Sequence, residues 1–167
     1  MEEYDVPGLS VAVARNGSLA YAQGFGVADK KTGEKVTPAH LFRIASISKP
    51  ITSVAIFSLV EQGRLKLADK VFGAGGILES DHDVPPAKKY INNITIGHLL
   101  THASGGWPNG PNDPMSAHKE MNHRKLISWT LNNLPLTSPP GTKFIYSKFR
   151  LLRARPRDRE DCPTGVC

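Results

Sequence analysis

The sequence predicts a mixed α/β fold of the α+β kind, in which an N-terminal β-hairpin precedes a helical region. Apolar stretches at 9–15 and 18–26 flank Asn16-Gly17, the strongest short signal for a hairpin turn. A dense apolar run at 51–60 has the length of a buried helix. A helical spacing of apolar residues returns over 122–131. Strands in one region and helices in the next are typical of the α+β class.

Length and composition indicate one globular domain. The chain has 167 residues, of which 40% are hydrophobic and 22% charged. A folded chain of this size buries about 70% of the surface that its unfolded form exposes. Residues 1–7 lack the basic and apolar regions of a signal peptide, and no run is long enough to span a bilayer. We therefore expect a cytoplasmic protein without a membrane span.

The net charge of +6 is concentrated near the C-terminus. Residues 148–167 contain six basic and three acidic side chains, together with both cysteines, Cys162 and Cys167. The remaining body is only mildly basic, which argues against a dedicated nucleic-acid surface. Without cysteines, the body holds neither a disulfide scaffold nor a thiolate metal site. The segment 148–167 has no sustained period, so we expect a domain at 1–147 followed by a disordered basic tail.

The first elements follow from local signals. Residues 9–15 and 18–26 are expected to pair as antiparallel strands, and Gly24 and Gly26 indicate a bulge or a close backbone approach. The next helix is expected to begin with Ser46 as its N-cap, to have Pro50 in its first turn and to end at Gly63. Its apolar density predicts burial on most faces.

The later elements are shorter. A helix over 95–102 is expected to be capped by Thr95, and a longer one is expected over 122–131. Glycine and proline clusters predict loops at 73–86 and 107–114, and residues 142–147 are expected to be extended.

The pair Ser46 and Lys49 is the strongest candidate for chemistry. The two residues are three positions apart, so both side chains can point into the same space at a helix start. A serine hydroxyl needs a neighbouring base to act as a nucleophile, and backbone N–H groups at a helix start can hold an oxyanion. The alternative is that Ser46 only caps the helix and Lys49 is solvated. The same Ser-x-x-Lys spacing at Ser116–Lys119 lacks an apolar helix, so the pattern alone is weak.

The other polar groups are expected to have structural roles. His98 and His102 are four apart on the predicted helix, but the glutamate of a His-Glu-x-x-His zinc motif is missing. We therefore expect no metal and no cofactor. Asp81-His82-Asp83 is expected to be a solvated loop. The arginines of 148–167 suit an acidic partner, but interspersed acidic residues favour a solvated tail.

Several blocks occur in the order found in one known family. They are Val6–Gly17, Gly24–Asp29, Phe42–Lys49, Ile94–Gly105 and Pro140–Ser147. Together they resemble the serine beta-lactamase-related family, which includes class C beta-lactamases, D,D-peptidases (penicillin-binding proteins) and related esterases. The resemblance covers about residues 6–147.

The resemblance implies a fold, a reaction and a site. The implied fold is an α/β sandwich with an antiparallel sheet and an all-helical insert. Ser46 resembles the acylated nucleophile, Lys49 the group that takes its proton, and Tyr146 the tyrosine of a Tyr-x-Asn motif that relays protons to the leaving group. The implied substrates are small molecules or peptides with an amide, lactam or ester bond.

The sequence departs from this family in three places. Lys148 replaces the asparagine of Tyr-x-Asn, so an amide becomes a purely cationic donor. The Lys/His-x-Gly motif and the later sheet strands are missing, and Lys31-Thr32-Gly33 is interpreted as a chance match. The family's first helix is reduced to Met1–Asp5. These departures predict a truncated domain, an out-of-frame or alternatively spliced segment 148–167, and impaired activity.

Two hypotheses of function remain open. The first is a serine hydrolase of the beta-lactamase/D,D-peptidase type that is acylated at Ser46. The second is a catalytically inactive fragment or pseudoenzyme of the same family, acting as a binding module. A third possibility, a basic binding module that uses the tail, predicts salt-dependent binding.

Overall fold

A computed structural model describes residues 1–147 except 83–87, 89 and 111–112. The expected tail at 148–167 lies outside the described residues. The chain divides into two compact units, Met1–Ile44 and a second unit that begins at Ala45.

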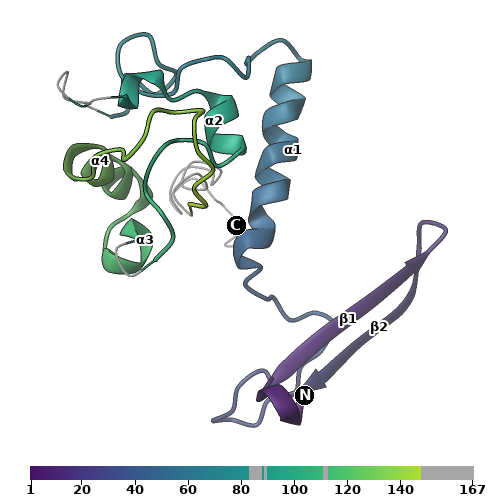
Figure 1. The fold of residues 1–167 in the computed structure, drawn as a ribbon. Helices are drawn as coiled ribbons and strands as arrows, with labels where there is room; N and C mark the ends of the chain where they lie inside the picture. Colours follow the sequence, from purple (N-terminus) through teal and green to yellow (C-terminus); the bar gives the residue numbers. More distant parts are fainter. Residues whose placement is uncertain (83–87, 89, 111–112, 148–167) are drawn as a thin grey trace. The chain divides into compact units, whose positions relative to one another are not determined.

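The first unit is built on a β-hairpin. Strand β1 (Gly8–Arg15) pairs antiparallel with β2 (Ser18–Gly26), as Figure 1 shows in purple, with Gly8 opposite Gly26. The turn residues Asn16 and Gly17 have φ angles of 52° and 77°. Two positive φ angles are what a two-residue type I′ turn requires. The hairpin and its turn are therefore confirmed.

Glycines in β2 let neighbouring backbone approach closely, as expected. A Cβ atom added at Gly24 would collide with the carbonyl oxygen of Val36. Gly26 has a φ of 74°, and a Cβ there would collide with the carbonyl of Pro7. The segment that follows the hairpin can therefore pack on β2 only because Gly24 lacks a side chain, and the residues before β1 can approach Gly26 for the same reason.

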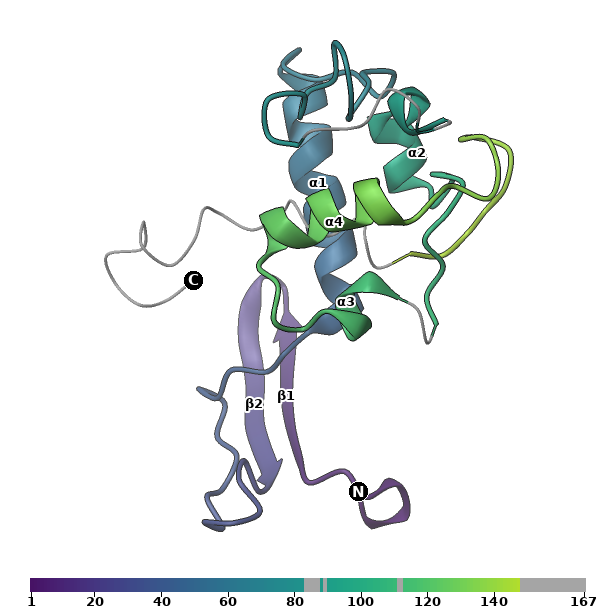
Figure 2. The same cartoon turned by 90° about the vertical axis from the view of Figure 1, so that its left-hand side faces the viewer.

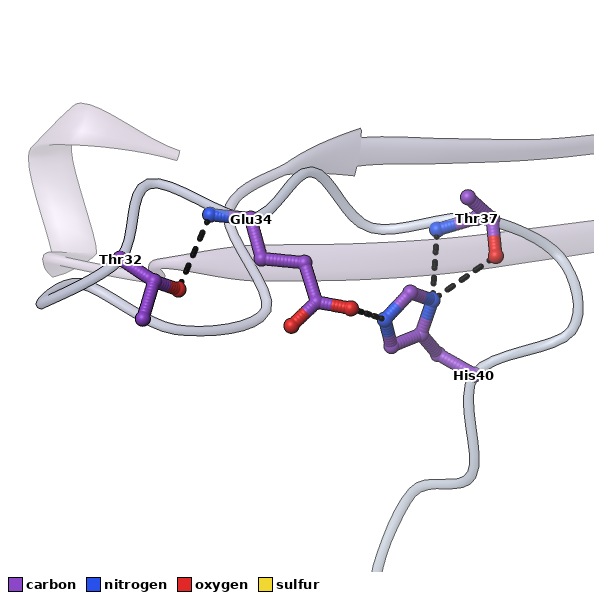
Figure 3. A network of polar contacts seen from close by, with 4 residues as sticks. All are labelled: Thr32, Glu34, Thr37 and His40. Carbon is purple, nitrogen blue, oxygen red and sulfur yellow. Dashed lines mark hydrogen bonds and ion pairs between the residues drawn. The ribbon is translucent and has the colours of Figure 1, made fainter.

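The loop after the hairpin is held by a local polar network (Figure 3). The Nδ1 atom of His40 accepts a hydrogen bond from the backbone N–H of Thr37 at 3.0 Å. Its Nε2 therefore carries the proton and donates to the Glu34 carboxylate at 3.1 Å. The hydroxyl of Thr32, from the Lys31-Thr32-Gly33 stretch, accepts from the Glu34 N–H at 3.4 Å. Thr32 thus has a local role in this turn.

The second unit begins with a 3-10 turn, η2 (Ala45–Ile47), which leads directly into helix α1 (Ser48–Glu61). Gly63 follows the helix with a φ of 69°, as predicted for a glycine that ends it. The expected N-cap is wrong. Ser46 lies inside the 3-10 turn, and the cap position is taken by Ile47, which makes no side-chain capping bond. The extra turn displaces the cap by one residue and releases the Ser46 hydroxyl from a capping role.

The predicted burial of α1 on most faces is also wrong. Lys49 is its only buried residue, while Ile51, Val54 and Phe57 are 51–70% exposed. Ile47, at the N-cap, is 65% exposed. Figures 1 and 2 agree that α2 lies beside the C-terminal half of α1. The described residues therefore cover only part of the helix circumference. A high density of apolar residues predicts that a helix surface favours burial, but it does not show which segments pack against that surface.

Three shorter α-helices and a 3-10 helix, η3 (Ile91–Asn93), lie in the described part of the second unit after α1. Helix α2 (Ile96–Leu100) is capped by Thr95 in a capping box with His98, and α4 (His123–Asn133) is capped by Asn122. Both helices were predicted. The four-residue α3 (Pro114–Ala117) is capped by Asp113 and begins at Pro114, the last residue of the expected loop at 107–114. An aspartate before a proline at the first helical position is a sufficient local signal for it. Residues 142–147, expected to be extended, form no strand.

The core of the second unit forms around α4. Leu131 is fully buried and packs with apolar residues from the preceding segments and from α4 itself (Val71, Phe72, Leu78, Ile91, Ile94, Trp107, Leu126 and Ile127). His82, expected to be solvated, is only 6% exposed, and its Nδ1 lies 2.8 Å from the Ser128 hydroxyl on α4. His82 is therefore packed against α4 and is not solvated. Asp83 lies outside the described residues. Of the helices in the described part of the chain, none has the length and hydrophobicity needed to cross a bilayer.

Candidate active site

The Ser46 hydroxyl is presented by the 3-10 turn that precedes α1. Ala45, just before it, has a φ of 42°, a left-handed conformation that residues with a Cβ rarely adopt. Such backbone conformations occur often at functional sites, where the surrounding structure holds them. Ser46 is exposed, so a molecule from solution can reach its hydroxyl.

Lys49 lies in the first turn of α1 with its amine directed at Ser46. Its Nζ donates a hydrogen bond to Ser46 Oγ at 3.1 Å, although only 5% of the residue is exposed. No carboxylate within the described residues forms an ion pair with this amine. The alternative in which Lys49 is a solvated surface lysine is therefore wrong.

Tyr146 reaches the same hydroxyl from the other end of the unit. Its phenol oxygen lies 2.9 Å from Ser46 Oγ, and the Lys49 Nζ sits 4.9 Å from the centre of its ring. That amine–ring distance is within the range of a cation–π contact. The structure thus brings together all three residues that the sequence singled out, with the Ser46 oxygen between an amine and a phenol.

The segment that carries Tyr146 is anchored by neighbours that the sequence did not identify. The carbonyl of Tyr146 accepts a hydrogen bond from the backbone N–H of Asn109 at 3.0 Å. The ring of His102 stacks on the Tyr146 ring, with centroids 4.5 Å apart and an interplanar angle of 29°. His102 was considered in the sequence only as a metal ligand, because its spacing from His98 was the only local signal.

The remaining histidine and Ser-x-x-Lys candidates are used locally. His98 Nδ1 accepts from the Thr95 N–H at 3.2 Å as part of the α2 capping box. In the parts of the chain that are described, no three His, Cys, Asp or Glu side chains gather closely enough to hold a metal ion. Ser116 lies in α3 with its hydroxyl 3.5 Å from the Asp113 carboxylate, and Lys119 is exposed. The second Ser-x-x-Lys copy therefore does not reproduce the buried amine of the first.

The geometry at Ser46 suits nucleophilic chemistry. An accessible hydroxyl with an amine and a phenol in hydrogen-bond reach has two groups that can accept or return its proton.

Comparison with known proteins identifies the family. A family model described as Beta-lactamase matches residues 1–152. The chain is 31% identical over 147 residues to a beta-lactamase of Pseudomonas fluorescens, covering 88% of this chain and 37% of that protein. A relative named protein flp from Staphylococcus aureus is 30% identical over 151 residues, covering 88% of this chain and 28% of flp. The chain thus spans about a third of the length of these relatives.

Solved structures give the same result. A penicillin-binding protein homologue from Pyrococcus abyssi superposes with a TM-score of 0.70 at 28% identity, covering 91% of this chain and 35% of that one. A beta-lactamase/D-alanine carboxypeptidase from Pseudomonas syringae superposes with a TM-score of 0.63 at 28% identity, covering 91% and 39%. The hairpin and helical units are therefore part of a beta-lactamase/transpeptidase-type fold, as predicted. This chain belongs to the beta-lactamase family, and its membership of that family supports a function of the serine hydrolase type.

Proposed function

We propose that this chain carries the acylation machinery of a serine hydrolase, with Ser46 as nucleophile, Lys49 as general base and Tyr146 as proton relay. The observation that carries the proposal is the position of Ser46 Oγ, 3.1 Å from the Lys49 amine and 2.9 Å from the Tyr146 phenol. A nucleophilic serine requires a base at this range, and a second proton-carrying group assists the leaving group.

The proposed reaction begins with attack of the Ser46 oxygen on a carbonyl carbon. A neutral Lys49 amine takes the hydroxyl proton as the new C–O bond forms, and the carbonyl oxygen gains the negative charge. Tyr146 gives its proton to the leaving nitrogen or oxygen and recovers one from Lys49. The bond to the leaving group then breaks and leaves an acyl ester on Ser46. A water molecule then attacks the acyl ester in the same way, the bond to Ser46 breaks, and the acid product and the free serine are released.

The proposed substrates carry an amide, lactam or ester bond. Both the beta-lactamase of Pseudomonas fluorescens and the beta-lactamase/D-alanine carboxypeptidase of Pseudomonas syringae are named for reactions of such bonds. The exposed Ser46 hydroxyl and the 38% exposed Tyr146 side chain leave the reacting groups accessible to a small molecule or peptide.

Covalent labelling tests this proposal. The purified chain is incubated with a fluorescent penicillin and, separately, with a fluorophosphonate, and the modified peptide is located by mass spectrometry. We expect label on the peptide containing Ser46, none in Ser46→Ala, and full labelling in Ser116→Ala, which removes the serine of the second Ser-x-x-Lys copy. Equal labelling of the wild type and Ser46→Ala would show that the nucleophile lies elsewhere.

A second candidate function is binding without catalysis. It is favoured by Lys148, which stands in place of the asparagine of the Tyr-x-Asn motif. The labelling experiment separates the two functions. A folded chain that takes up neither probe, yet retains reversible affinity for an unreactive D-alanyl-D-alanine peptide, would support this second function.

A further inference from the structure

We propose that His102 is a positioning residue that holds the Tyr146 phenol against the Ser46 hydroxyl. This inference rests on the proposed function, because it gives Tyr146 a task that depends on its position. It extends that function by adding a fourth residue, which acts through Tyr146.

His102 contacts the segment around Tyr146 at three points. Its carbonyl accepts a hydrogen bond from the Ile145 N–H at 2.7 Å, and its Nδ1 accepts one from the Ser147 N–H at 3.2 Å. Its ring also stacks on the Tyr146 ring, with centroids 4.5 Å apart. The backbone is therefore held on both sides of Tyr146, and the ring is held from one face. One residue fixes both the place and the tilt of the phenol.

One further ring contact and the burial of Ser147 restrict the movement of this segment. The Phe144 ring meets the His102 ring edge-on, with centroids 5.6 Å apart, and Ser147 is only 4% exposed. Because Nδ1 accepts a hydrogen bond, the proton of the neutral imidazole is on Nε2. The side chain is thus engaged through one ring nitrogen, one ring face and one ring edge.

The backbone of His102 shows that its side chain matters. Helix α2 ends with Thr101 at its C-cap, and His102 follows with a φ of 57°. This left-handed position after a helix is usually filled by glycine, because a Cβ atom there is strained. A histidine at this site accepts that strain and gains contacts to 145–147 that glycine cannot make through a side chain.

Loss of the side-chain contacts of His102 should slow the reaction at Ser46. The Tyr146 phenol oxygen lies 2.9 Å from Ser46 Oγ, which leaves little room for displacement before the hydrogen bond is lost. A displacement of about 1 Å in a reacting group costs roughly a hundredfold in rate. His102 therefore acts through the tyrosine and not by direct contact with substrate.

The decisive variant is His102→Gly, which suits the left-handed backbone and removes only the side chain. We expect the rate of Ser46 labelling by the fluorophosphonate to fall about tenfold or more, with the thermal unfolding midpoint little changed. In a Tyr146→Phe background, the same substitution should cause no further loss, because the group that His102 positions is already gone. The control is His118→Ala, since His118 also packs on an aromatic ring, Trp129, at 4.0 Å between centroids.

A second measurement does not depend on activity. In a chain with labelled tyrosines, the ring resonances of Tyr146 are identified by their absence in Tyr146→Phe. We expect His102→Gly to shift these resonances, because the stacked imidazole is removed, and to leave those of Tyr21 unchanged. If no variant or wild type labels at Ser46, the proposed function fails, and the resonance shift alone decides the role of His102. An unchanged Tyr146 resonance, or equal rate losses with and without the phenol, would overturn the inference.

Discussion

The hydroxyl of Ser46 lies 2.9 Å from the phenol oxygen of Tyr146, which is one hundred positions further along the chain. Ser46 comes from the turn before α1, and Tyr146 from the loop that follows Pro139 and Gly141. Neither local segment holds the other group, so the pair exists only when the second unit is folded. Removing one oxygen atom tests what this contact contributes.

Replacing Tyr146 by phenylalanine should slow acylation of Ser46 by about a hundredfold, the lower end of the range for loss of a proton-transfer group. The ring that contacts the Lys49 amine at 4.9 Å and stacks on His102 is retained, so the fold should be preserved. The rate is measured as single-turnover labelling with the fluorophosphonate. Tyr21→Phe, which removes a half-exposed phenol from β2, serves as the control. An unchanged rate in Tyr146→Phe would remove the tyrosine from the mechanism.

Replacing Lys49 by arginine should abolish labelling almost completely, with a loss of about a hundredfold to ten-thousandfold. The positive charge is kept, but a guanidinium cannot give up its proton and so cannot act as a base. Lys119→Arg, in the second Ser-x-x-Lys copy, should label normally. Residual activity near the wild-type level in Lys49→Arg would mean that another group takes the proton. Circular dichroism spectra of both variants show whether the fold is intact.

Replacing Gly24 by alanine should loosen the hairpin unit. The new methyl group would overlap the carbonyl of Val36, which is backbone and cannot rotate away. We expect faster amide hydrogen exchange over residues 8–26 and a destabilisation of about 1–3 kcal/mol, the usual cost of overpacking. Gly110→Ala is the matched control, because nothing lies within 4 Å of the added Cβ. Equal exchange in the two variants would argue against the close approach of these segments.

Truncating Leu131 to alanine should cost about 2–5 kcal/mol of unfolding free energy, because it opens a cavity in the core around α4. Leu131 is 0% exposed, whereas Val54 on α1 is 70% exposed. Val54→Ala should therefore change stability by less than about 0.5 kcal/mol. Urea unfolding followed by tryptophan fluorescence measures both, since Trp107 belongs to the same core. Similar losses for the two variants would contradict the assigned core.

Elements that depend on local chemistry were predictable from the sequence. The hairpin follows from Asn16-Gly17, and the start of α2 follows from Thr95, because turn and cap preferences act within a few residues. The spacing of Ser46 and Lys49 fixed their proximity for the same reason. Tyr146 was found through family resemblance alone, since no local pattern connects it with a serine so far away.

The features that escaped prediction depend on tertiary contacts. The exposure of α1 is decided by what lies beside it, and the burial of His82 is decided by Ser128 on α4. The role of His102 needs both a left-handed backbone and a ring stacked across the fold. None of these conditions can be read from the residue types that surround each position in the chain.

An exposed apolar stripe, formed by Ile51, Val54 and Phe57 on α1 together with Ile47 at its N-cap, has a practical consequence for work with this protein. Hydrocarbon in contact with water favours self-association, and the tendency grows with concentration. Kinetic experiments therefore belong at low protein concentration, with light scattering as a routine check. A mild non-ionic detergent that shields the stripe should extend the shelf life of the purified chain.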